Sequence, residues 1–130
     1  MRVLVCGDRY WNDYAELSGA LLSFIRFSGL IPQDVTVISG AAAGADTLAA
    51  KCAKIHGMSL QEYEADWDSY GKAAGPIRNK AMLVDGLPDI VIAFHDSIST
   101  SKGTANMIKQ ARKAGLVVYL YAHSGLTKYE

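Results

Sequence analysis

Four segments of the chain combine glycine with charged, hydroxyl or aromatic side chains, the residue types that bind phosphorylated ligands. They are residues 7–11, 39–46, 66–79 and 95–104. Glycine lets a ligand approach the main chain, arginine forms paired hydrogen bonds with phosphate oxygens, and aromatic rings stack on bases. These segments therefore indicate a binding site for an anionic ligand that carries a ring.

The first two segments each follow a short apolar run. In residues 7–11, Arg9 suits a phosphate group, and Trp11 either belongs to the site or packs in the core. The small residues of 39–46 precede a helical pattern, so main-chain N–H groups and the helix dipole favour an anion there. This segment has neither a Walker motif nor a complete Gly-x-Gly-x-x-Gly motif. Asp46 either stabilises the helix N-terminus or acts on a ribose hydroxyl or an attacking water.

The third segment places cations and aromatic rings together around glycine. Pro76 suits the first turn of a helix, which puts Arg78 near the N-terminal end of that helix. Lys72 and Arg78 can reach phosphates, while Trp67 and Tyr70 can stack on a base. The alternative interpretation is a surface lid that binds nothing.

The fourth segment, residues 95–104, is rich in serine and threonine and also leads into a helix. Gly103 and Thr104 form a second candidate anion site at that helix N-terminus. His95 could act in acid–base chemistry, but no carboxylate partner can be assigned to it. A hydrogen-bonded structural role for His95 is therefore favoured.

Apolar runs typical of strands alternate with helical periodicity along the chain. Strands are predicted at 2–6, 35–38, 58–64, 89–94 and 116–121, and helices at 13–29, 45–56, 77–84 and 104–114. This order predicts one α/β domain over residues 1–130, doubly wound, with a mainly parallel five-stranded sheet and helices on both faces. The alternation in 58–64 indicates an edge strand, and 122–130 forms a tail or an added turn. Ligands of such sheets bind at the carboxyl ends of the strands, where the four segments fall.

Composition narrows the function classes. The chain has 13 basic and 13 acidic residues, a balance that disfavours nucleic-acid binding. Cys6 and Cys52 lie in apolar segments, which indicates buried, reduced thiols of a cytoplasmic protein. His56 follows Cys52 at helical spacing, but no further ligand stands near, so no metal site is predicted. The sequence shows no signal peptide or membrane span, and its 50% hydrophobic content allows a homo-oligomer.

Taken together, the motifs resemble a known family. They are Gly7-Asp8-Arg9-x-Trp11, Ser39-Gly40-x-Ala42-x-Gly44-Ala45-Asp46, Asp66-Trp67, Gly71-Lys72-x-Ala74-Gly75-Pro76-x-Arg78-Asn79, Leu87-Pro88-Asp89 and Gly103-Thr104. The chain is identified on these residues as similar to the YspA-like, cpYpsA-related SLOG family. That family belongs to a Rossmann-like superfamily that includes the LOG phosphoribohydrolases and the DNA-processing protein DprA.

The resemblance implies a Rossmann-like fold that binds or senses a nucleotide or an NAD-derived or ADP-ribose-like ligand, with no other cofactor. The residues expected to bind it are Gly7, Asp8, Arg9, Trp11, Ser39, Gly40, Gly44, Ala45, Asp46, Trp67, Lys72, Gly75, Arg78, Asn79, Gly103 and Thr104.

Two other functions follow from relatives in the superfamily. The first is hydrolysis of an N-glycosidic or phosphoribosyl bond, with Arg78 and either Asp46 or Asp66 as catalytic residues. The LOG enzymes carry a glutamate after a Gly-Thr pair, whereas Gly103-Thr104 is followed by Ala-Asn-Met. The second is DNA binding like that of DprA, which the neutral net charge disfavours.

Overall fold

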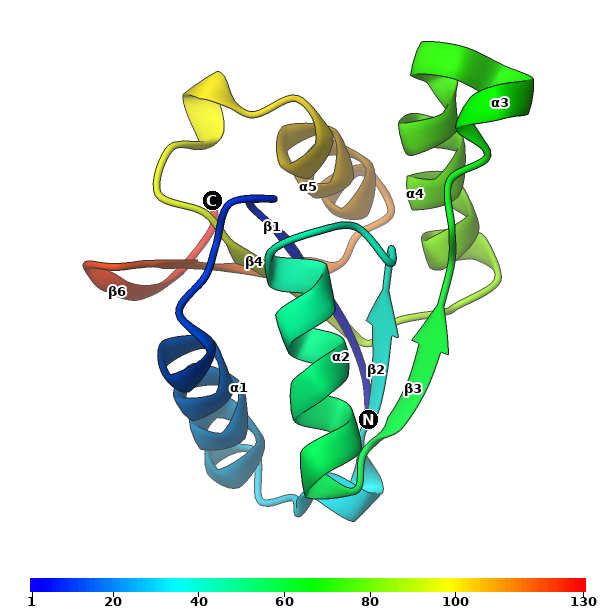
Figure 1. The fold of residues 1–130 in the computed structure, drawn as a ribbon. Helices are drawn as coiled ribbons and strands as arrows, with labels where there is room; N and C mark the ends of the chain where they lie inside the picture. The colour runs from blue at the N-terminus through cyan, green and yellow to red at the C-terminus, as the bar shows by residue number, and fades with distance from the viewer.

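A twisted six-stranded sheet runs through the molecule and carries helices on both faces (Figure 1). We describe residues 1–130 from a computed structural model. The strands are β1 (Arg2–Gly7), β2 (Thr36–Ser39), β3 (Ser59–Glu62), β4 (Ile90–Phe94), β5 (Val117–Ala122) and β6 (Gly125–Lys128). Their order across the sheet is β3-β2-β1-β4-β5-β6, and every neighbouring pair is parallel except β5 and β6.

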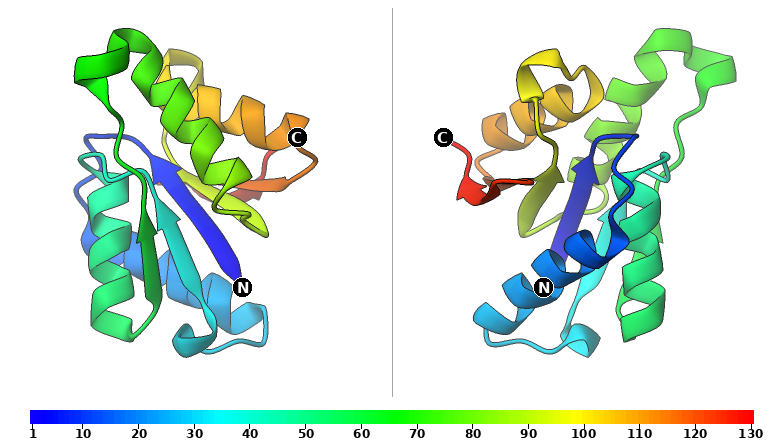
Figure 2. Two further views of the ribbon diagram at one scale, coloured as in Figure 1. Left: turned by 90° about the vertical axis from the view of Figure 1, so that its right-hand side faces the viewer. Right: turned by 60° about the vertical axis from the view of Figure 1, so that its left-hand side comes forward.

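Four longer helices cover the sheet, two on each face (Figure 2). The helices are α1 (Tyr14–Phe27), α2 (Ala45–His56), α3 (Trp67–Tyr70), α4 (Ala74–Val84) and α5 (Gly103–Lys113), with 3₁₀ turns at Pro32–Asp34, Gly71–Ala73 and Ile98–Thr100. α1 and α2 cover one face, and α4 and α5 cover the other. None of the helices is both long and apolar enough to cross a membrane.

Local signals in the sequence account for where the helices begin and end. Asp13 caps α1, because its Oδ1 accepts a hydrogen bond from the Glu16 N–H at 2.9 Å. α2 ends at Gly57, whose φ of 76° places it in the left-handed conformation that favours glycine. Both features were predicted from residue type alone, and the structure confirms them.

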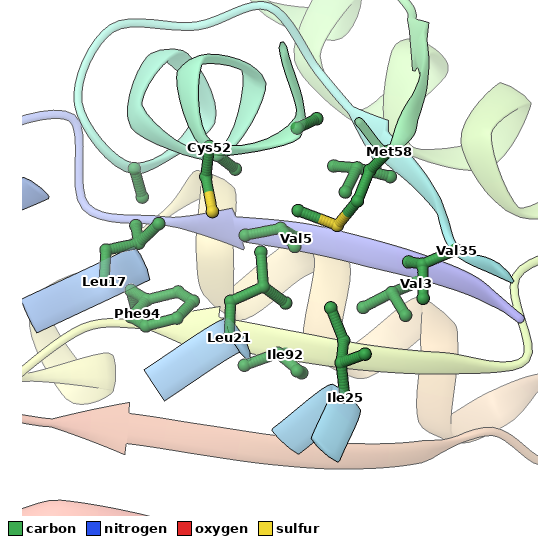
Figure 3. Packing of buried hydrophobic residues seen from close by; sticks show 14 of the residues in the cluster. Val3, Val5, Leu17, Leu21, Ile25, Val35, Cys52, Met58, Ile92 and Phe94 are labelled. Carbon is green, nitrogen blue, oxygen red and sulfur yellow. The ribbon is translucent and has the colours of Figure 1, made fainter. Parts of the chain in front are cut away.

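The core lies in two layers on either side of β1. Val3 and Val5 face α1 and α2, where they pack with Leu21 among other apolar side chains (Figure 3). Leu4 and Cys6 belong to the cluster on the opposite face, under α4 and α5. Because successive residues of a strand point to opposite faces, a strand covered on both sides needs a continuous apolar run. Both cysteines are buried free thiols.

The Rossmann-like doubly wound architecture is confirmed, and β3 is an edge strand as predicted. The strand count of five was wrong, because Gly125–Lys128 forms a sixth strand antiparallel to β5. This strand is mostly exposed and pairs through its main chain, so its side chains carry no apolar alternation. The third segment was predicted as a loop up to residue 76 with a helix from residue 77, but it contains α3, and α4 begins at Ala74.

The connections of the sheet locate a crevice. From β1 the chain builds outward to β2 and β3, then crosses to the other side of β1 to form β4. The strand order therefore reverses between β1 and β4, and the loops that leave their carboxyl ends diverge there. In Figure 1 these loops lie at the end of the molecule that also carries α3.

Candidate functional site

A cavity of about 520 Å³ opens at the carboxyl ends of β1, β2 and β4. All four segments singled out in the sequence contribute to its wall. Nine of the predicted residues line it, namely Gly7, Asp8, Arg9, Asp46, Trp67, Arg78, Asn79, Gly103 and Thr104. Nine further residues line it that were not predicted to bind ligand, namely Cys6, Tyr10, Ala42, Met82, His95, Thr100, Ser101, Lys102 and Met107.

Arg78 is held in place by neutral acceptors rather than by a carboxylate. Its Nη1 donates to the Gly40 carbonyl oxygen at 2.6 Å, and its Nε donates to Asn79 Oδ1 at 3.0 Å. The guanidinium group makes no ion pair and interacts with Asp46 only at longer range, so it can still bind an anion in the cavity. Two of its five N–H groups are used internally, which leaves others free for a forked contact.

A chain of amide groups fixes the residue that holds Arg78. Asn79 is only 3% exposed, and its Nδ2 donates to Asn106 Oδ1 at 3.1 Å and to the Gly103 carbonyl at 3.4 Å. Gln110 donates to the same Asn106 oxygen at 2.7 Å and to the Pro76 carbonyl at 3.2 Å. These bonds join α4 to α5, so the two helices that wall the cavity set the orientation of the guanidinium together.

Asp46 lies in the first turn of α2 and is 6% exposed. Its Oδ2 accepts the Ala42 N–H at 3.2 Å, whereas its Oδ1 is out of contact with water and has no hydrogen-bond partner. Burial raises the pKa of this carboxyl group to about 6. The Ala42 N–H, the charge of Arg78 and the Gly40 N–H lower the pKa, and Glu62 adds a smaller upward contribution. A buried polar atom without a partner is costly, so this carboxyl group needs a further donor.

Two glycines let the loops after β1 and β2 pack tightly against their neighbours. Gly44 has a φ of 78°, and a Cβ there would lie 2.3 Å from the Asp8 carbonyl oxygen. A Cβ on Gly7 would lie 2.3 Å from the Phe94 carbonyl oxygen. The Ala45 N–H then donates to the Asp8 carbonyl at 3.1 Å and joins the two loops. Gly44 and Ala45 were predicted to bind ligand, but neither lines the cavity.

Aromatic side chains from two loops stand at the rim. Tyr10 is 79% exposed and Trp67 is 57% exposed, and both line the cavity. Gly75 was predicted as a ligand residue and instead lies beneath Trp67, because a Cβ there would come within 3.3 Å of the indole ring. Trp67 is therefore supported from below while its outer surface stays free.

The fourth segment closes the remaining side of the cavity. Ser101 Oγ accepts the main-chain N–H groups of Thr104 and Ala105 at 3.1 and 3.2 Å, so this side chain caps α5. His95 lines the cavity, and its Nδ1 accepts the Ser97 N–H at 2.9 Å, which fits the structural role favoured from the sequence. Lys102 adds a cation to the rim.

The inner wall of the cavity is apolar and contains sulfur. Cys6, Met82 and Met107 line it and are 7%, 2% and 1% exposed. Burial, with a contribution from Asp46, raises the pKa of the Cys6 thiol well above its usual range, so this thiol is not activated as a nucleophile. Met107 lies near the N-terminal end of α5, so the residues that follow Gly103-Thr104 bring no carboxylate to this wall.

The other predicted residues do not line this cavity. Trp11 is 5% exposed and packs in the core, stacked on His123 at 4.3 Å between ring centroids. Ser39 is buried and its hydroxyl accepts the Ala41 N–H at 3.3 Å, which shapes the loop from behind. Lys72 is exposed on the 3₁₀ turn after α3. Asp66 caps α3 through the Ser69 N–H at 3.1 Å.

Gly40 does not line the cavity, but it sits between two residues that do. A Cβ on Gly40 would lie 2.8 Å from Arg78 Nη1 and 3.0 Å from Asp46 Oδ2. The absence of a side chain there allows the guanidinium and the carboxyl group to occupy the same corner of the site.

These features define a class of protein: a Rossmann-like α/β domain with a cationic cavity at the switch point of its sheet. The chain belongs to the YspA, cpYpsA-related SLOG family, whose model matches residues 1–70. It is 34% identical over 122 residues to the gene 61 protein of Mycobacterium phage D29, covering 90% of this chain and 93% of that protein.

A solved structure shares the fold. The X-ray structure of DNA processing protein A (DprA) from Streptococcus pneumoniae matches with a TM-score of 0.66 and 19% sequence identity. The match covers 92% of this chain and 49% of DprA, so this chain spans about half of that protein.

Proposed function

We propose that the protein binds or senses a nucleotide, or an NAD-derived or ADP-ribose-like molecule, with its phosphate groups held by the cations of the cavity. One observation carries the proposal: Arg9, Arg78 and Lys102 line a single cavity, and none of them forms an ion pair. Unpaired cations around one concavity favour a ligand with more than one negative charge. The volume of about 520 Å³ lies within the range of roughly 300–1,000 Å³ that is usual for small-molecule sites.

The rest of the lining supports a ligand that also carries a ring. Tyr10 and Trp67 present exposed aromatic surfaces beside the cations, and a base can stack on such surfaces. Two carboxylates also line the cavity, but Asp8 accepts the Tyr10 N–H at 2.9 Å and Asp46 is buried with a raised pKa. Three cations and two carboxylates line the cavity, so its formal charge stays positive even when both carboxylates are ionised.

Calorimetric titration with ADP-ribose, NAD and AMP tests the proposal. We expect Arg78→Met to weaken binding by about 10- to 100-fold, the range for loss of a charge-assisted contact to phosphate. Lys80→Met is the matched control, because Lys80 lies on the same helix, is exposed and does not line the cavity. No binding of any of the three compounds at millimolar concentration, or an equal loss in both variants, would refute the proposal.

A hydrolase is the second candidate, because a buried carboxyl group, Asp46, shares a corner of the cavity with Arg78. Cleavage of an N-glycosidic bond passes through a cationic sugar that a carboxylate stabilises. Incubation with AMP and NAD, followed by chromatography for free base, separates the two functions. Free base that disappears in Asp46→Asn would make the protein an enzyme rather than a binding module alone.

A further inference from the structure

The Asp46 carboxyl group is the one side chain of the cavity whose hydrogen bonding is conspicuously incomplete. A carboxylate has about four lone-pair positions for donors, and only main-chain N–H groups reach this one: Ala42 at 3.2 Å from Oδ2, with a further contribution from Gly40. Its Oδ1 is buried and has no partner. A ligand that enters the cavity and donates a hydrogen bond would remove the cost of this arrangement.

No neighbouring side chain donates a hydrogen bond to Asp46 Oδ1. Arg78 directs Nη1 to Gly40 and Nε to Asn79, and it forms no ion pair with Asp46. The Cys6 thiol is a weak donor and is itself buried. Because the main-chain N–H groups of Ala42 and Gly40 leave Oδ1 without a partner, a donor for Oδ1 has to come from outside the chain.

The position of Arg78 indicates which group of a ligand could donate a hydrogen bond to Asp46. Arg78 Cζ and Asp46 Oδ2 would each lie 3.0 Å from a Cβ on Gly40, so the two groups meet at one corner of the site. A ligand whose phosphate is held by Arg78 must carry its donor a few bonds from that phosphate. In a nucleotide, the hydroxyl groups of the sugar satisfy this requirement, whereas the amino groups of the base lie farther away.

We propose that Asp46 accepts a hydrogen bond from the 2′- or 3′-hydroxyl of the ligand's sugar, and so selects ribonucleotides over deoxyribonucleotides. This inference rests on the proposed function and adds the class of ligand to it. A site built to bond a hydroxyl group discriminates strongly against an analogue that lacks it, because the buried acceptor is then left unpaired. The same selection works against single-stranded DNA as the occupant of the cavity.

The test compares the dissociation constants of AMP, 2′-deoxyAMP and 3′-deoxyAMP for the wild-type protein, Asp46→Ala and Asp68→Ala. Asp68 is the matched control, because it is an exposed carboxylate on α3 that does not line the cavity. We expect at least one deoxy analogue to bind the wild type about 10-fold more weakly than AMP. The ratio should fall to under about 2-fold in Asp46→Ala and remain unchanged in Asp68→Ala.

A second measurement needs no variant and remains decisive if Asp46→Ala does not fold. The ratio of AMP to deoxyAMP affinity in the wild type is measured at pH 7.5 and pH 5. A neutral carboxyl group accepts a weaker hydrogen bond than a carboxylate, so the ratio should be smaller at pH 5. Because both nucleotides carry the same phosphate, protonation of the phosphate cancels in the ratio.

The outcomes separate this inference from the proposed function. Equal affinities for AMP and both deoxy analogues would overturn the inference while leaving the proposed function standing. If the ratio of AMP to deoxyAMP affinity persists in Asp46→Ala, or is the same at both pH values, a group other than Asp46 recognises the sugar hydroxyl, and the inference is overturned. Failure of every nucleotide to bind would overturn both.

Discussion

Replacing Asp46 by asparagine should stabilise the folded protein at neutral pH. Burial raises the pKa of this carboxyl group from an ordinary 3.8 to about 6, so folding disfavours its charged form. A shift of about two pH units corresponds to roughly 3 kcal/mol of stability lost once the group is ionised in both states. Asparagine keeps an oxygen that can accept the Ala42 N–H and carries no charge to bury.

The sign of the effect fixes its pH dependence. Between pH 3.8 and about 6 the folded state binds more protons at this site than the unfolded state, so wild-type stability falls as pH rises through that window. Above about pH 6 the full loss of about 3 kcal/mol in wild-type stability is present. Below it the carboxyl group is neutral in both states, and the difference between wild type and Asp46→Asn should approach zero.

Urea denaturation of both proteins from pH 4 to pH 8 measures this difference, and other titrating groups cancel in the comparison. We expect Asp46→Asn to be more stable by about 3 kcal/mol at pH 7.5, which is a melting temperature about 10 °C higher. Asp68→Asn, an exposed control, should change stability by less than about 0.5 kcal/mol. Equal stability at pH 7.5, or a difference that does not vary with pH, would refute the account of Asp46 as a buried carboxylate that lacks a donor.

Three further substitutions test other parts of the structure. Gly44→Ala should destabilise the fold by at least about 2 kcal/mol in urea denaturation, because of its positive φ and its contact with the Asp8 carbonyl; a neutral result would mean that this loop relaxes freely. Gly75→Val should displace the ring of Trp67 and weaken ADP-ribose binding several-fold, and unchanged affinity would remove Trp67 from the site. Leu21→Ala should cost about 3 kcal/mol of stability with little effect on nucleotide affinity, and the reverse pattern would contradict its place in the core.

The sequence predicts the architecture well wherever side-chain burial decides it. β1 reads as a continuous apolar run because α2 covers one of its faces and α5 the other. β6 was not predicted, because an exposed edge strand is held by main-chain hydrogen bonds and its sequence therefore shows no alternation of apolar and polar residues. α3 was not predicted either, because a helix of four residues is too short to show helical periodicity, although Asp66 is a residue type that caps helices.

The location of the site follows from topology, but its individual residues do not. Loops at the carboxyl ends of β1 and β4 must diverge where the strand order reverses, and this places the cavity. Which of two adjacent aromatic residues enters it depends on the path of the loop: Tyr10 lines the cavity, while Trp11 turns into the core. Met82 and Met107 look like ordinary core positions on their helices, because the cavity floor is also the edge of the core.

The two charged groups that meet at Gly40 differ in how complete their surroundings are, and this difference assigns them different roles. Arg78 is already oriented by Gly40 and Asn79, so an anion that binds it meets a group that needs no reordering. Asp46 is buried with an oxygen that lacks a donor, so a matching hydroxyl group removes a cost that other ligands leave in place. Arg78 should therefore set the affinity for every phosphorylated ligand, and Asp46 should set the choice among them. It follows that Asp46→Asn gains stability and loses discrimination together, whereas Arg78→Met loses affinity for AMP and deoxyAMP alike.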